Sequence, residues 1–442
     1  MSSLRERLRG SLWPLPVLAV VLAIGLGVGL PALDQALEQP GGEHPLTFVF
    51  GGGPTVARDV LAAIAGSLIS VTGLTFSFTV VALQLSSSQH SPRLLQTFET
   101  DRVVQSTLAA LVGTFVFALT VLRTIRIEQS EGDAFVPRLS VTVAFVLTVL
   151  SVIGLVLFLG HLARSLRVES MLRDVSVEAR ATFDRELPPD EQGVAGAPAF
   201  AVPEGEPSIV PATSSGFLVD VDDARVAQAA EDAGATVLLA HRIGNSVVTG
   251  TPLAHVWPGP AGSRADVDAV HRALEQGVRL GFERTPQRDV AYSLRKSVDI
   301  TVRALSPGTN DPTTAVHGLS HVSALLGELV TRPLLTVVVR DGSGTVRFVR
   351  PQWDAPELLR LGIEEPLQFA GGQPAVLRRL ATLLRELAFR APRGTLGGEL
   401  LRLLERVGEL ARDTTGIERA ETDRWDRVLR DALTGRWPAE PG

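Results

Sequence analysis

The sequence predicts a membrane α-helical protein with four transmembrane helices, followed by a cytoplasmic α+β region with a small β-rich module and a mostly helical C-terminal part. Three observations lead to this fold class. The 442 residues are 45% hydrophobic, with a mean hydropathy of +0.22, which is too apolar for an ordinary soluble protein. Four early stretches lack charged residues over a membrane-spanning length. Short β-rich runs and then amphipathic helical patterns follow them.

The predicted transmembrane domain covers residues 1–165, and its four spans are 10–32, 60–89, 103–122 and 139–163. Seven Arg residues flank the spans on the side of the N-terminus, against four on the other side. The excess predicts a cytoplasmic N-terminus, and an even number of spans then places the C-terminus in the cytoplasm as well. A cleaved signal peptide could imitate the first span, but this stretch is long and three further spans follow.

The second span carries a stripe without apolar side chains. At about 100° per residue, Asp59 and six further residues fall within an arc of about 60° that holds no Val, Leu, Ile, Phe or Ala. The six residues are Gly66, Ser70, Gly73, Ser77, Gln84 and Ser88. Lipid offers nothing to a hydroxyl or an amide, so we expect the stripe to face another helix or water.

Two interpretations of this stripe remain open. Its small-xxx-small pairs permit close packing of two helices, whereas its hydroxyls and Gln84 suit the uncharged wall of a water-filled path. Both hold if the packing partner is another subunit around an axis. No span carries Asp, Glu, Lys or Arg at its centre, which argues against a proton relay, a voltage sensor or a charge-coupled transporter.

A polar turn between membrane and cytoplasm follows the second span, and it contains Gln89, Ser91, Pro92 and Arg93. One interpretation anchors this turn at the lipid headgroups through Arg93. The alternative makes Gln84, Gln89 and Arg93 an anion-attracting vestibule, which one arginine per subunit forms only in an oligomer.

The remaining chain divides into three predicted parts. Residues 166–213 read as a helical stalk and a Pro/Gly-rich linker, residues 214–260 as the β-rich module, and residues 264–442 as a mainly helical domain with a β-hairpin near 334–349. In the module we expect strands at 216–221, 236–240 and 246–256 and a helix at 224–233. The apolar faces of the C-terminal helices need a partner within the domain or in a second subunit.

A candidate pocket lies in the predicted helical domain. Asp311 is a natural N-cap before Pro312, but a polar turn at a helix N-terminus can also hold an anion. Its positive charge would come from nearby arginines, unless they pair with acidic neighbours. The candidate residues are Arg284, Asp299, Arg303, Asn310 and Asp311.

Several classes of function lack support. The chain has no Cys, no phosphate-binding loop and no nucleophile with an evident base, so we expect no catalytic residues and no cofactor. His317 and His321 have metal-ligand spacing but no third ligand, so no metal site is predicted. Residues 1–165 hold ten basic and ten acidic residues, so the net charge of −6 belongs to the remainder, and no nucleic acid partner is expected.

The motifs on both halves resemble those of one family. Val71-Thr72 through Phe76-Ser77, Ser88-Gln89-His90-Ser91-Pro92-Arg93 and, much later, Arg303-Ala304-Leu305-Ser306-Pro307-Gly308-Thr309-Asn310-Asp311-Pro312 lie in the sequence in this order. They are similar to the signatures of an uncharacterised bacterial membrane-protein family, domain of unknown function 2254. The resemblance implies a multi-pass protein of the bacterial inner membrane with a cytoplasmic domain, and it implies no activity.

Together these inferences predict an oligomeric channel or transport-like protein with a cytoplasmic gating domain. The expected partners are the lipid bilayer, further copies of the chain in a homo-oligomer, and a small ion or anionic ligand. The alternative is a membrane-anchored ligand sensor or scaffold without transport activity.

Overall fold

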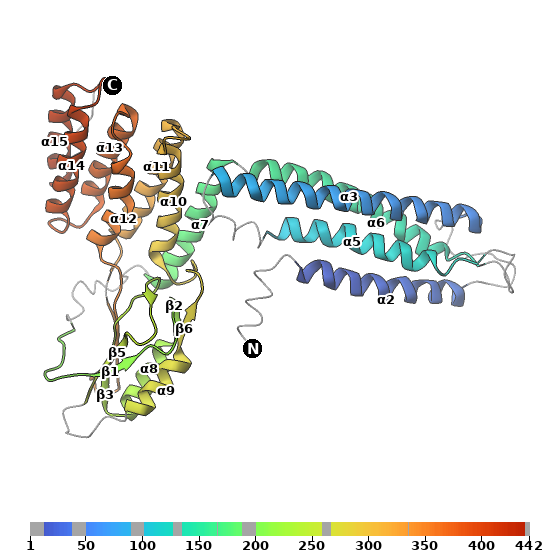
Figure 1. Cartoon of the computed structure of the whole chain (residues 1–442), viewed down its shortest axis with the longest axis horizontal. Coiled ribbons are helices and arrows are strands. Elements are labelled where there is room, and N and C mark those ends of the chain that lie inside the picture. Colours follow the sequence, from blue (N-terminus) through green and yellow to red (C-terminus); the bar gives the residue numbers. More distant parts are fainter. Residues whose placement is uncertain are drawn as a thin grey trace. The chain divides into compact units, whose positions relative to one another are not determined.

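The computed structural model describes residues 13–37, 50–89, 101–126, 135–165, 167–187, 200–258, 267–334 and 336–437. The chain forms two compact units, Met1–Ser170 and Met171–Gly442 (Figure 1). Among the described residues, four long helices make up the first unit, and a helical bundle and a β module make up the second.

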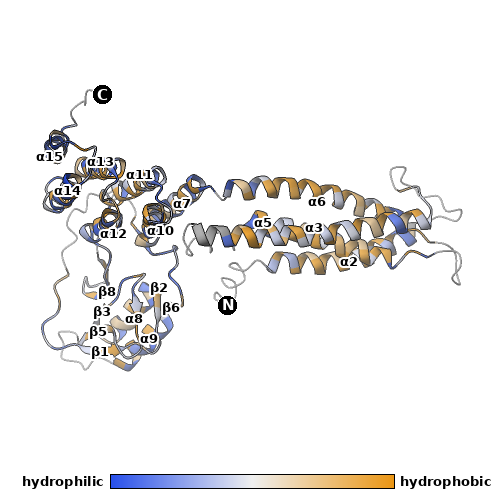
Figure 2. Cartoon of the chain, turned by 45° about the horizontal axis from the view of Figure 1, so that its top comes forward, coloured by the Kyte–Doolittle hydropathy of each residue, from blue (hydrophilic) through white to orange (hydrophobic). Residues whose placement is uncertain are grey.

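The four helices of the first unit lie side by side and are mostly apolar (Figure 2). They are α2 Pro14–Leu37, α3 Pro54–Gln89, α5 Arg102–Leu122 and α6 Arg138–Ser165. Each is long and apolar enough to cross a membrane, so the four predicted spans are confirmed as helices of suitable length and composition. Helix α5 is the most enclosed of the four. Within its most apolar segment 56% of the residues are buried, against 22 to 28% in the corresponding segments of α2, α3 and α6.

Two of these helices extend beyond the predicted spans. Helix α3 begins at Pro54, since proline is favoured in the first helical turn. Its 36 residues make about 54 Å at 1.5 Å per residue, which exceeds a hydrocarbon core of about 30 Å. Helix α2 continues to Leu37 and therefore includes Asp34. The charge-free pattern marks the apolar part of a helix and not its ends.

Seven helices form the helical bundle of the second unit. They are α7 Val168–Glu186, α10 Val290–Leu305, α11 Pro312–Leu329, α12 Ala355–Gln368, α13 Pro374–Arg390, α14 Gly397–Arg412 and α15 Arg419–Leu433. The predicted apolar faces of α13 and α14 are buried in one shared core, so their partner lies within the same unit. The predicted stalk, α7, also contributes Ala179 and Phe183 to this core.

Two sheets and two helices form the β module. The five-stranded sheet has the order β1 Ser208–Pro211, β5 Pro252–Pro258, β3 Ala235–Leu239, β8 Val346–Arg350 and β7 Val337–Arg340. The three-stranded sheet has the order β4 Ser246–Val247, β2 Gly216–Val221 and β6 Val278–Gly281. Helices α8 Asp223–Asp232 and α9 Val267–Gly277 accompany them.

The module extends beyond the expected residues 214–260, because β6 at Val278–Gly281 pairs with β2. It differs from the sequence expectation in three further places. The strand expected at 246–256 is two strands, β4 and β5, because the chain turns at Gly250 with φ of +83°. The hairpin near 334–349 belongs to the five-stranded sheet, through parallel pairing of Val237 with Phe348, and not to the helical bundle. Strand β1, inside the expected linker, pairs with β5. The places of the hairpin and of β1 depend on pairing between distant segments, which a local pattern does not report.

Candidate functional site

The polar stripe of α3 lies on the outward face of the first unit. Gly66, Ser70, Gly73, Ser77 and Gln84 are all exposed, as is Asp59. The buried residues of the same helix are Ala57, Leu61, Ile64, Ala65, Leu68, Thr75, Thr79 and Ala82. At 100° per residue the centres of the two sets differ by about 180°. Helix α3 therefore packs in its own bundle with the face opposite to the stripe.

The two glycines of the stripe are not used for packing within the described chain. A Cβ added at Gly66 or Gly73 would meet no heavy atom within 4 Å among the described residues. A Cβ at Gly27 of α2, in contrast, would lie 2.7 Å from Cβ of Thr120 on α5. Glycine is required for close helix contact at Gly27, but no contact explains it at Gly66 or Gly73.

Large apolar side chains flank the stripe on the surface of α3. Ile69, Leu74, Phe76 and Val81 are each 46 to 56% exposed. Within the stripe, the Ser70 hydroxyl donates to the carbonyl of Gly66 at 3.0 Å. On the buried side, Thr75 and Thr79 donate to carbonyls of their own helix. The outward face thus combines a narrow small and polar strip with apolar borders.

The polar turn after the second span is only partly described. Ser88 and Gln89 lie in the last turn of α3, where the backbone alone is described. Ser91, Pro92 and Arg93 lie outside the described residues. The two interpretations of this turn therefore stay predictions.

One polar contact that sequence reasoning missed joins the end of α2 to the start of α6. The carboxylate of Asp34, 2% exposed, accepts hydrogen bonds from the backbone N–H of Leu139 at 2.9 Å and of Ser140 at 3.0 Å. It also accepts from the Ser140 hydroxyl at 2.7 Å. Asp34 thus caps a helix other than its own. An Asp at the end of an apolar stretch is a signal for such a role, but the sequence does not identify its partner.

A second missed contact joins α5 and α6 at the opposite end of the bundle. Asp101 caps α5 by accepting from the N–H of Val103 at 2.8 Å, and its other oxygen lies 2.6 Å from Nε2 of His161 on α6. Between the two ends, the hydroxyls of Thr114 and Ser151 are hydrogen-bonded at 3.0 Å in the buried contact of the same two helices. These groups stabilise contacts between helices of the bundle, and none of them is a residue of the stripe.

The candidate pocket of the second unit is not brought together. Arg284 precedes α10, whereas Arg303 is in its last turn and Asp311 follows it. The 16 residues of α10 extend about 24 Å at 1.5 Å per residue, so Arg284 and Asp311 lie at opposite ends of the helix. Asp299 is paired with Arg295 at 2.7 Å, four residues before it on the same helix.

Each end of α10 carries its own local structure. Arg284 donates to Asp289 at 2.8 Å, and burial raises the pKa of this carboxyl despite the attraction of Arg284. At the other end Asp311 caps α11, as the sequence predicts, and hydrogen bonds from Thr314 lower the pKa of its carboxyl. Asn310, with φ of +46°, accepts from Gln373 at 2.8 Å. The contacts at this end are those of a helix cap.

His321, the second of the two histidines on α11, contacts helix α7. His321 lies 2.9 Å from the Ser176 hydroxyl of α7, and burial lowers the pKa of its imidazole. Within the described ranges, no three His, Asp or Glu side chains are grouped as metal ligands would be.

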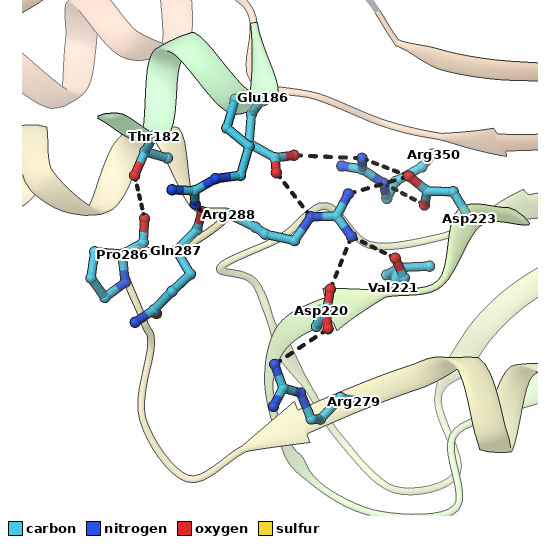
Figure 3. Close-up of polar contacts among 11 residues, drawn as sticks. Thr182, Glu186, Asp220, Val221, Asp223, Arg279, Pro286, Gln287, Arg288 and Arg350 are labelled. Atoms are coloured by element: carbon cyan, nitrogen blue, oxygen red, sulfur yellow. Dashed lines mark hydrogen bonds and ion pairs between the residues drawn. The ribbon is translucent and has the colours of Figure 1, made fainter. Parts of the chain in front are cut away.

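A network of charged residues connects the helical bundle with the β module (Figure 3). Arg288, just before α10, donates to Glu186 of α7 at 3.0 Å and to Asp220 of β2 at 2.9 Å. Arg350, at the end of β8, donates to both carboxylate oxygens of Asp223 at 3.0 and 3.1 Å. The sequence does not indicate this network, because its members come from four stretches that are far apart along the chain.

A bundle of four membrane-length helices with an outward polar strip, followed by a unit of helices and sheets, defines a class of multi-helix membrane protein. The family described as "Predicted membrane protein (DUF2254)" matches residues 9–386, which include all four of these helices, and the chain belongs to this family. The match ends within α13, before α14 and α15.

The chain is also similar to curated proteins of mycobacteria. Uncharacterized proteins of Mycobacterium bovis and Mycobacterium tuberculosis are each 36% identical over 392 residues, covering 87% of this chain and 73% of the relative. No solved structure matches the chain.

Proposed function

We propose that the protein is a homo-oligomeric channel or transport-like protein of the bacterial inner membrane, in which the α3 stripes of several subunits surround a central path. One observation carries this proposal: the stripe faces away from its own bundle, with its two glycines contacting no other described residue.

A lipid environment does not suit this face. Burying an amide or a hydroxyl in hydrocarbon without a hydrogen bond is unfavourable, and Gln84 and Ser77 are both exposed on the stripe. Glycines on a lipid-facing surface also forgo the apolar contact that a side chain would make. A second copy of the same helix satisfies both requirements, because small residues permit close approach and the polar groups then face an axis.

The chemistry of the stripe favours a passive path. Its members from Gly66 to Gln84 are uncharged, and uncharged polar walls conduct water or small ions without a proton relay. Gating by the soluble unit is part of the proposal, because the chain passes from α6 at Ser165 to α7 at Val168 and α7 packs into the helical bundle. A signal in that unit thus has a short covalent route to a membrane helix.

The oligomer is tested first by crosslinking the full chain in native membranes. The natural chain has no Cys, so a single Cys at Gly73 reports on one position alone. We expect Gly73→Cys to form a disulfide between subunits on mild oxidation. Ser106→Cys, exposed on α5 away from the stripe, is the control and should stay monomeric.

Transport is tested by ion flux in liposomes that contain the purified chain. We expect Ser77→Leu and Gln84→Leu to reduce the flux at least about tenfold, because apolar side chains dewet a narrow path. Ser106→Leu should leave the flux unchanged. A wild-type chain without flux would refute the transport proposal, and crosslinking without flux would favour the membrane-anchored sensor or scaffold.

A further inference from the structure

The second unit has two apolar cores that share no described residue. One core joins α7 and α10 to α15, and the other lies inside the β module between its sheets and helices α8 and α9. A continuous apolar core would hold the helical bundle and the β module together over a broad surface. Their contact must therefore depend heavily on the polar groups between them.

Arg288 is at the centre of these polar groups (Figure 3). From the helical side it reaches three groups of the β module: Asp220 at 2.9 Å, the carbonyl of Val221 at 2.5 Å and Asp223 at 3.3 Å. Glu186 of α7 accepts from the same guanidinium at 3.0 Å. One side chain thus neutralises carboxylates from both halves of the unit.

A second arginine makes the reciprocal contact. Arg242, in the β module between β3 and β4, pairs with Glu357 of α12. Its guanidinium lies 3.7 Å from the ring centre of Trp353, which packs against the core of the helical bundle. Each half therefore contributes arginine side chains that pair with carboxylates of the other half.

The centre of this network is sheltered from water, whereas Asp220 at its edge is 39% exposed. The side chains of Arg350 and Glu186 are only 2% and 7% exposed, and that of Arg288 is 22% exposed. Although burial lowers the pKa of Arg288, the hydrogen bond to Asp220 and the charge of Glu186 raise it above the ordinary value. Arg288 thus stays charged at any physiological pH.

A sheltered charge network is stable only while it is complete. Without Arg288, Glu186 and Asp223 would keep Arg350 as a close arginine, and Asp220 would keep Arg279, which lies in the β module like Asp220 itself. Each carboxylate would regain hydration if the two halves separated. An apolar junction weakens gradually as area is lost, whereas the loss of one charge from such a network leaves its partners buried without a counter-charge.

We propose that the β module is a movable arm, held against the helical bundle by a charge latch made of Arg288, Glu186, Asp220, Asp223 and Arg350. The inference is independent of channel activity. It means that a competing ion or partner that takes up one charge of the latch releases the arm as a folded body.

The distance between two spin labels on the full chain in nanodiscs tests the latch. Because the chain has no Cys, labels go only to Glu231→Cys on α8 and Ala324→Cys on α11, both exposed positions. We expect one narrow distance population in the otherwise natural chain. Arg288→Met should add a broader population displaced by more than the width of that peak, and Asp220→Asn should do the same to a smaller extent. Arg430→Met, which removes an exposed pair with Asp426, is the matched control and should change nothing.

Each result decides the proposal. An added population with an unchanged helix signal in circular dichroism supports a folded arm that moves. Unchanged distances in both latch variants would overturn it, and so would an equal change in Arg430→Met. If Arg288→Met does not fold, Asp220→Asn is the deciding variant. If Asp220→Asn loses its helix signal in circular dichroism as well, the network is required for folding and does not act as a latch.

Discussion

Replacing Asp34 by Ala removes the contact that joins α2 to the start of α6. Two backbone N–H groups at the N-terminus of α6 lose their acceptor, and loss of such a cap costs about 1 kcal/mol. The hydroxyl of Ser140, 0% exposed, also loses its partner, which adds about 1–3 kcal/mol. We therefore expect Asp34→Ala to lower the free energy of unfolding of the full chain by about 2–4 kcal/mol.

The assay is reversible unfolding of the full chain in mixed micelles with increasing SDS, followed by circular dichroism. Ser140→Ala is the matched control, because it removes the hydroxyl together with its need for a partner and keeps both backbone hydrogen bonds. It should cost less than half as much as Asp34→Ala. Equal stability of Asp34→Ala and the wild type, within the error of the assay, would refute the capping role.

Two further predictions concern a glycine contact and a helix cap. Gly27→Val should destabilise the membrane unit by about 1–3 kcal/mol in the same assay, because its Cβ would meet Thr120. Gly73→Val should leave the unfolding of a detergent-solubilised monomer unchanged, so a similar loss in both would show that the stripe packs within its own chain. Asp311→Ala should cost about 1 kcal/mol at neutral pH as a lost N-cap. Since the folded pKa of Asp311 is lowered, its contribution is present above the ordinary value of 3.8 and is lost as the pH falls below it. Thermal melts of wild type and Asp311→Ala should therefore converge in acid, and a difference that persists or grows there would contradict this assignment.

The sequence predicts those features that depend on local pattern. The four membrane-length helices follow from uninterrupted apolar runs, and the cap at Asp311 follows from its position before Pro312. The helical wheel of α3 groups Gly66 to Gln84 on one face, but it does not reveal which face meets the bundle, because the packing partner α5 lies in another segment. That the stripe faces outward is therefore visible only in the structure.

The sequence pattern does not predict contacts that join distant segments of the chain. Nothing local to Asp34 indicates Ser140 as its partner, and nothing in the run from Val346 to Arg350 indicates parallel pairing with β3. The sequence also does not show how far apart the residues of the candidate pocket lie. Arg284 and Arg303 are close enough in sequence to suggest one site. Arg284 precedes α10, however, and Arg303 is in its last turn, so the two lie at opposite ends of the helix.

The place of β8 in the five-stranded sheet bears on how the chain is synthesised. Strand β3 lies between β5 and β8, and Val237 pairs with Phe348, so the middle of the sheet is completed only after the ribosome has made α9, α10 and α11. Until then the free edge of β3 can pair with other extended segments. We expect chains cut off before Val346 to keep this edge open, and therefore to aggregate or to be recognised by chaperones and proteases more readily than the full chain.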